Sequence, residues 1–126
     1  MNAKLPSAPV PDRLDPGALQ RLRDLDPDGR QGVVVRVLTA FESSLTRLLA
    51  QLEAQREGGD AAVVCTVAHT LKSSSASVGA LDLAAACAEV ESRLRGGASS
   101  ALGRDVDHLL AQGHAALRAV GAMLRP

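Results

Sequence analysis

The stretch Val67-Ala68-His69-Thr70-Leu71-Lys72-Ser73-Ser74-Ser75-Ala76-Ser77-Val78-Gly79 has the spacing of a helix with two different faces. His69 lies roughly 160° around such a helix from Leu71, because successive residues turn by about 100°. Apolar or small residues recur every three or four positions and form a stripe that we expect to be buried: Val64, Val67, Ala68, Leu71, Ser75 and Val78. The stretch therefore predicts a helix that buries one side and presents an imidazole on the other.

The surroundings of His69 favour a reactive ring that a large partner can approach. Lys72 lies one turn on, where its ammonium favours an anionic group on the ring. A neutral imidazole keeps a nitrogen lone pair that can attack phosphorus. In-line phosphoryl transfer also needs two surfaces that bring donor and acceptor close together. The residues that share the outward face are all small: Ala62, Thr66, Ser73, Ala76 and Ala80.

The composition and the spacing of the remaining residues predict an all-α protein. The chain has 126 residues, 46% of them hydrophobic, with one Phe and neither Tyr nor Trp, so Ala, Leu and Val supply the core. We expect an antiparallel four-helix bundle with a short extra N-terminal helix lying across one end. The first helix starts at Asp15-Pro16 and ends at the turn 26–29, and the other four span 31–56, 60–79, 82–95 and from near Ser99 or Ser100 to the end. Residues 13–126 form this domain, and residues 1–12, with three Pro, are expected to be a flexible leader or linker.

Several other side chains are assigned ordinary structural roles. Phe41 is expected in the core, and Cys65 and Cys87 are expected to be small buried hydrophobes. Glu89 and Glu91 are expected on the helix surface, where ion pairs with Arg93 and Arg95, four residues on, give the helix weak support. The three Arg residues around the Gly96-Gly97 turn are expected to be solvated: Arg93, Arg95 and Arg104.

The sequence excludes several classes of function. The 14 Lys and Arg residues balance the 14 Asp and Glu residues, so the chain has no excess of positive charge that would attract nucleic acid. The aromatic side chains on which single-stranded bases stack are also missing. No apolar run approaches the roughly 20 residues of a membrane span, and no signal peptide is evident, so we expect a cytoplasmic protein without membrane insertion. His108 and His114 are six residues apart, on different sides of one helix, and complete no metal site. No Gly-rich phosphate loop is present, so ATP is not the direct phosphoryl donor.

The run from His69 to Gly79 resembles the signature of histidine-containing phosphotransfer (HPt) domains of bacterial phosphorelays. In that family His is followed by Lys at the third position, then by Gly and small residues, and by a second Gly at the tenth position. The resemblance extends from about Leu14 to Leu124. It includes the Leu-Asp-Pro opening, Phe41, and the run Leu83…Cys87…Glu91.

The resemblance implies a phosphoryl carrier rather than an enzyme. His69 is expected to accept a phosphoryl group from a receiver-domain aspartate and pass it to another, with Lys72 as the cation beside it. Gly79 matches the distal glycine that permits close packing near the His, and Ser73 departs from the family's Gly. The expected docking residues are Ala62, Thr66, Ser73, Ala76, Gly79 and Ala80.

The resemblance also implies the partners of the chain. They are response-regulator receiver domains and a hybrid sensor histidine kinase. The domain is expected to be a monomer that binds no cofactor itself, and Mg²⁺ is expected on the receiver.

Two other readings remain open from the residues. One is a helical adaptor that binds a signalling partner through the same face without phosphate. The other is a metal-binding bundle, which the histidine spacing disfavours. The sequence also leaves open whether the domain stands alone or ends a hybrid kinase.

Overall fold

The computed structural model describes residues 13–126, and this part of the chain is all-helical, as the sequence predicts. No strand occurs within it. The helices are α1 (Pro16–Asp24), α2 (Val33–Glu53), α3 (Ala61–Val78), α4 (Leu81–Arg95) and α5 (Leu102–Leu124). The expected leader, residues 1–12, lies outside the described residues.

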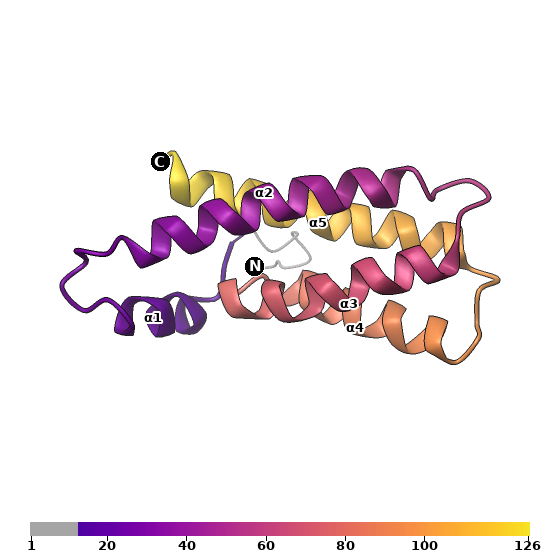
Figure 1. The fold of residues 1–126 in the computed structure, drawn as a ribbon, viewed down its shortest axis with the longest axis horizontal. Coiled ribbons are helices and arrows are strands. Elements are labelled where there is room, and N and C mark those ends of the chain that lie inside the picture. Colours follow the sequence, from indigo (N-terminus) through magenta and orange to yellow (C-terminus); the bar gives the residue numbers. More distant parts are fainter. Residues whose placement is uncertain (1–12) are drawn as a thin grey trace, which may run out of the picture.

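The four long helices form an antiparallel bundle (Figure 1). Each runs against the helix before it, so the chain passes along the bundle four times and reverses direction three times. α3 packs most extensively on α4, and α2 packs most extensively on α5. α1 lies at one end, in contact with α2 and α3, and in Figure 1 it runs along the long axis rather than across it.

The core consists of the apolar stripes that the sequence predicts. The α3 stripe is buried without exception, and Phe41 and Cys87 are buried as expected, whereas Cys65 is only partly buried. Leu94, Leu102, Leu117 and Leu124 pack against the core but stay partly exposed. α2 packs closely on α5 at Gly113, where an added Cβ would lie 2.4 Å from Leu49 Cδ2. Helix spacing there depends on the missing side chain.

α2 begins two residues later than predicted, because a buried carboxylate holds the preceding turn. Asp26 accepts hydrogen bonds from the backbone N–H of Gln31 (3.0 Å) and of Val33 (3.2 Å). Gly32 adopts a left-handed conformation between them (φ 58°). The hydrogen bond from Gln31 is the main cause that lowers the pKa of Asp26. The Asp26 side chain therefore holds the segment before α2 in a hydrogen-bonded turn, and the helix starts only at Val33.

Other helix boundaries differ by a few residues. α2 ends at Glu53 rather than at residue 56, and α4 begins at Leu81. α5 begins at Leu102, and neither Ser99 nor Ser100 caps it with a side chain. Leu25 lies just past α1 and is 72% exposed. Asp15 and Asp60 cap α1 and α3 by accepting hydrogen bonds from Ala18 N (3.0 Å) and Ala62 N (2.9 Å), which agrees with the predicted starts of these helices.

Candidate functional site

His69 lies midway along α3 and its ring faces solvent. Its side chain is 61% exposed, while Ala68 and Leu71 beside it are buried in the core. The two faces predicted from the spacing are thus present. The ring is accessible to a second protein.

One ring nitrogen of His69 is held by a carboxylate from the neighbouring helix. Nδ1 lies 2.6 Å from Oε2 of Glu91 on α4, whose side chain is only 6% exposed. The expectation that Glu91 is a surface residue was therefore wrong. Its spacing carries the signal that was missed, because Glu91 lies four residues after Cys87 and eight after Leu83, on the buried face of α4.

Two cations complete the environment of the Glu91 carboxylate. Lys72 Nζ donates to Oε1 at 2.6 Å, from α3. Arg95 lies one turn after Glu91 on α4 and approaches Oε2 with Nε at 3.0 Å and Nη2 at 2.9 Å. The pairing of Arg95 with Glu91 four residues earlier is the one that the spacing predicts, and the Arg95 side chain also remains exposed to solvent. Lys72 contacts Glu91 rather than the ring in this structure.

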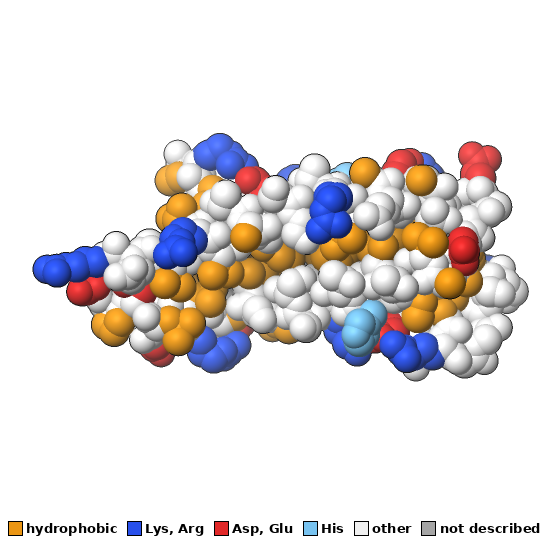
Figure 2. All heavy atoms as spheres, in the orientation of Figure 1, with side chains coloured by type: hydrophobic (Ala, Val, Ile, Leu, Met, Phe, Trp, Pro, Cys, Tyr) orange, Lys and Arg blue, Asp and Glu red, His pale blue; other side chains and the backbone are white. Residues whose placement is uncertain are grey.

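These groups border an open depression of about 410 Å³ between α3 and α4, lined by His69, Lys72, Ala88, Glu91, Ser92 and Arg95. Figure 2 shows this part of the surface, where a histidine side chain lies with basic side chains and an acidic side chain close by. With Glu91 ionised and the ring neutral, the two cations give the cluster a net positive charge. The depression suits an anionic group beside the ring.

The charge state of Glu91 decides which ring nitrogen of His69 carries the proton. The hydrogen bond from Lys72 is the main cause that lowers the pKa of Glu91, from its ordinary 4.5 to about 2, assisted by His69 and Arg95 and opposed by burial. An ionised carboxylate only accepts hydrogen bonds, so Nδ1 must donate. In the neutral ring the lone pair is then on Nε2. Nε2 makes no hydrogen bond with any residue in 13–126.

The predicted docking residues divide into two groups. Four lie exposed on α3, on the same side as His69: Ala62, Thr66, Ser73 and Ala76. Gly79 and Ala80 are buried, so their inclusion in the docking face was wrong. They lie where α3 ends, and the chain turns inward there to start α4.

Gly79 has a different role from the one that the resemblance implies. It ends α3 in a left-handed conformation (φ 85°), and an added Cβ would lie 2.6 Å from the backbone nitrogen of Asp15. The Asp15 N–H donates to the Gly79 carbonyl at 2.8 Å. Gly79 is ten residues from His69, about 15 Å along a helix. It therefore permits close packing of α1 on the end of α3, not packing near His69.

Near the α4–α5 turn, Arg104 is exposed as expected, whereas Arg93 has a structural partner. Arg93 pairs with Asp105 at the start of α5 rather than with Glu89, although its side chain remains about half exposed. His108 and His114 are exposed, as expected for helix-surface residues, and His108 Nε2 lies 4.0 Å from Oε1 of Glu89.

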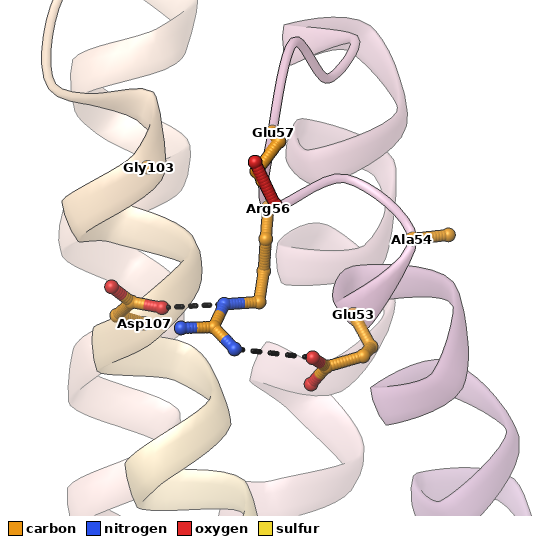
Figure 3. Close-up of a pocket in the computed structure, with 6 residues that line it drawn as sticks. All are labelled: Glu53, Ala54, Arg56, Glu57, Gly103 and Asp107. Atoms are coloured by element: carbon orange, nitrogen blue, oxygen red, sulfur yellow. Dashed lines mark hydrogen bonds and ion pairs between the residues drawn. The ribbon is translucent and has the colours of Figure 1, made fainter.

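A second depression, of about 500 Å³, lies where the end of α2 meets the first turns of α5 (Figure 3). Arg56 crosses it, with Nη1 3.2 Å from Glu53 Oε1 and Nε 3.0 Å from Asp107 Oδ1. These pairs connect the end of α2 to the first turns of α5. They are exposed, so screening by salt weakens them.

The described part of the chain has neither a cluster of metal ligands nor a membrane-spanning helix. No group of three or more His, Cys, Asp or Glu residues within 13–126 is arranged to hold a metal ion. None of the five helices is long and apolar enough to cross a membrane.

Comparison with protein families gives one match. The model of the Hpt domain matches residues 36–120, which is more than half of the chain and includes α3, α4 and most of α2 and α5. Searches of curated proteins and of solved structures gave no significant match.

Proposed function

From the membership of this chain in the Hpt domain family, whose members are phosphocarriers of phosphorelays, we infer that it carries a phosphoryl group on Nε2 of His69. The observation that supports this most directly is the pairing of Nδ1 with the Glu91 carboxylate on an exposed ring. Because Nδ1 donates, Nε2 keeps the lone pair that a nucleophile needs. His69 thus has the required tautomer without any rearrangement.

The chemical step proceeds as an in-line displacement. The Nε2 lone pair forms a bond to phosphorus, the P–O bond of a receiver's aspartyl phosphate breaks, and that electron pair stays on the aspartate carboxylate. Transfer to a second receiver is the same step in reverse. The chain's own contribution is to orient the ring and to supply positive charge from Lys72 and Arg95 beside the incoming group. Mg²⁺ is expected on the receiver.

The proposed docking surface is the exposed part of α3 around His69, together with the neighbouring face of α4. Ala62, Thr66, Ser73 and Ala76 are small and exposed, and Ala88 and Ser92 on α4 are also small and exposed. A receiver surface can therefore come close enough for transfer. Ser73 adds a hydroxymethyl group where the family has Gly, and its exposed position leaves docking possible.

The test is transfer from a phosphorylated receiver. We expect wild type to acquire acid-labile, base-stable phosphate, His69→Gln to acquire none, and His108→Gln to behave as wild type. Labelling that persists undiminished in His69→Gln would show that the acceptor is another residue. A wild-type protein that binds the receiver but is never labelled would instead be a helical adaptor.

A further inference from the structure

We propose that the end of the bundle at α1 is a dimer interface, where the chain packs against the same end of a second copy of itself. This surface is apolar, and the carrier role of His69 does not use it. A reversible dimer replaces the monomer that the resemblance implies. His69 lies midway along α3, so its ring stays open to a receiver in both copies.

Large hydrophobic side chains are exposed mainly at this end. Within residues 13–126 four such side chains are exposed, and three of them lie here: Leu25 (72%) just past α1, Val35 (60%) in the first turn of α2 and Met123 (40%) in the last turn of α5. These elements meet at one end of the bundle in Figure 1, and Figure 2 shows hydrophobic side chains there with charged ones between them. The same elements carry three partly buried apolar side chains, Leu22, Val34 and Leu124. We call these six residues the end patch. A single exposed Leu is ordinary, but several at one place mark an interaction surface.

Val35 is exposed because α5 ends before it reaches that level. Arg125, just past α5, pairs with Glu42, which lies about two helical turns after Val35. Val35 lies within about 20° of Glu42 around α2 and about 40° of Leu49, since successive residues turn by about 100°. Leu49 packs on α5 at Gly113. Val35 therefore continues the side of α2 that α5 covers further along.

Met123 continues a buried face in the same way. It lies within about 20° of Ala116 and about 40° of Ala119 around α5. Both alanines are buried in the core. Two helices thus extend core-type faces beyond the point where the rest of the bundle covers them. Such faces are covered by further helices in a bundle.

A second copy supplies those helices. α1 and α2 form a hairpin around residues 25–32, and α1 contacts α2. Two such hairpins related by a two-fold axis form a four-helix arrangement in which each covers the apolar side of the other. No further partner is needed, because the same surface serves both sides of the contact.

The charges around the end patch fit a surface that meets itself. Exposed side chains of both signs lie on α1, on the turn after it and on the start of α2: Arg21, Arg23, Asp24, Asp28, Arg30 and Arg36. In a two-fold contact a surface of one sign would repel its own copy, whereas a mixture of signs can pair across the axis. The formal net charge of 0 adds no long-range repulsion between copies.

The test measures the mass of the whole chain against its concentration, by sedimentation equilibrium from about 1 μM to about 1 mM, because an interface made of helix ends is small and weak. We expect the mass to rise from 13.0 kDa toward twice that value. Val35→Asp should raise the dissociation constant of the dimer by about tenfold or more, since each copy would bring a carboxylate against an apolar surface. Residue 35 lies in the first turn of α2, where the helix dipole favours a carboxylate, so the variant is expected to fold.

Two further measurements locate the interface. Ala50→Asp places the same charge on an exposed position further along α2 and is expected to leave the dissociation constant unchanged. Dilution of ¹⁵N-labelled wild type should shift amide NMR signals within residues 22–37 and 120–125, and leave those around His69 in place.

Each contrary outcome identifies a different error. A mass of 13.0 kDa at every concentration would overturn the dimer. A dimer that Val35→Asp weakens no more than Ala50→Asp, or dilution shifts centred on α3, would place the contact elsewhere and overturn the interface. Wild type that stays monomeric while Val35→Asp slows transfer from a phosphorylated receiver would make the end patch a receiver contact instead. Because His69 lies outside the end patch, these results are independent of whether the ring is phosphorylated.

Discussion

Nδ1 of His69 lies 2.6 Å from Oε2 of Glu91, although the two residues are 22 positions apart and belong to different helices. The contact joins an exposed ring to a buried carboxylate and so fixes the orientation of the ring. It also connects the ring to Lys72 and Arg95, which bind the same carboxylate. The orientation of the ring and the charge of the depression therefore both depend on one side chain.

Lys72→Ala is expected to keep the fold and to slow phosphoryl transfer or shorten the lifetime of the phosphorylated protein by about ten- to hundredfold. This range corresponds to the loss of one charge-assisted hydrogen bond. The measurement is single-turnover transfer from a phosphorylated receiver, with circular dichroism to check the fold. Lys72→Arg retains the charge and should recover part of the rate. Wild-type kinetics and lifetime in Lys72→Ala would remove Lys72 from the site.

Ala76→Arg is expected to reduce the rate of transfer from a receiver about tenfold or more, because a long charged side chain on the proposed docking face holds the two surfaces apart. The thermal midpoint should hardly change, since Ala76 is exposed. The matched control is Ala40→Arg, an exposed position on α2. Equal rates for the two variants would mean that the receiver docks elsewhere.

The stability that Glu91 contributes is expected to decrease in acid. Its pKa is about 2 in the folded protein against an ordinary 4.5, so between these values the unfolded chain binds a proton that the folded chain does not. The contribution is complete above about pH 4.5 and is lost as pH falls toward 2. Urea unfolding of wild type and Glu91→Gln from pH 6 to pH 2 measures it. The difference between their free energies of unfolding should shrink with falling pH, and a constant difference would contradict the assignment.

Gly79→Ala is expected to destabilise the protein more than Gly97→Ala. Both glycines have φ 85°, which costs an L-residue about 1–2 kcal/mol. Nothing lies within 4 Å of an added Cβ at Gly97, whereas at Gly79 it meets the backbone of Asp15. We expect an additional loss of about 1–3 kcal/mol from this clash, measured by urea unfolding. Equal losses would show that α1 adjusts without cost.

The helices and the core were predictable because they depend on residue spacing along the chain. The α3 stripe, the caps at Asp15 and Asp60 and the exposure of His69 all follow from local periodicity and capping chemistry. The start of α2 was not predictable in the same way, because it depends on a carboxylate at Asp26 that reaches over five and seven residues to backbone N–H groups. Such a turn competes with the first helical turn and leaves no periodic signal.

The sequence by itself determined an all-helical bundle, the helix that carries His69 and the side of that helix on which the ring lies. These are properties of one helix at a time, set by the period of the backbone. Only the tertiary structure decided which groups surround the ring, because the register of α3 against α4 places Glu91 beside Nδ1 and brings Lys72 to the same carboxylate. The same packing placed Gly79 against Asp15, away from His69. Contacts between helices depend on their relative rotation and height, and the spacing within either helix does not contain that information.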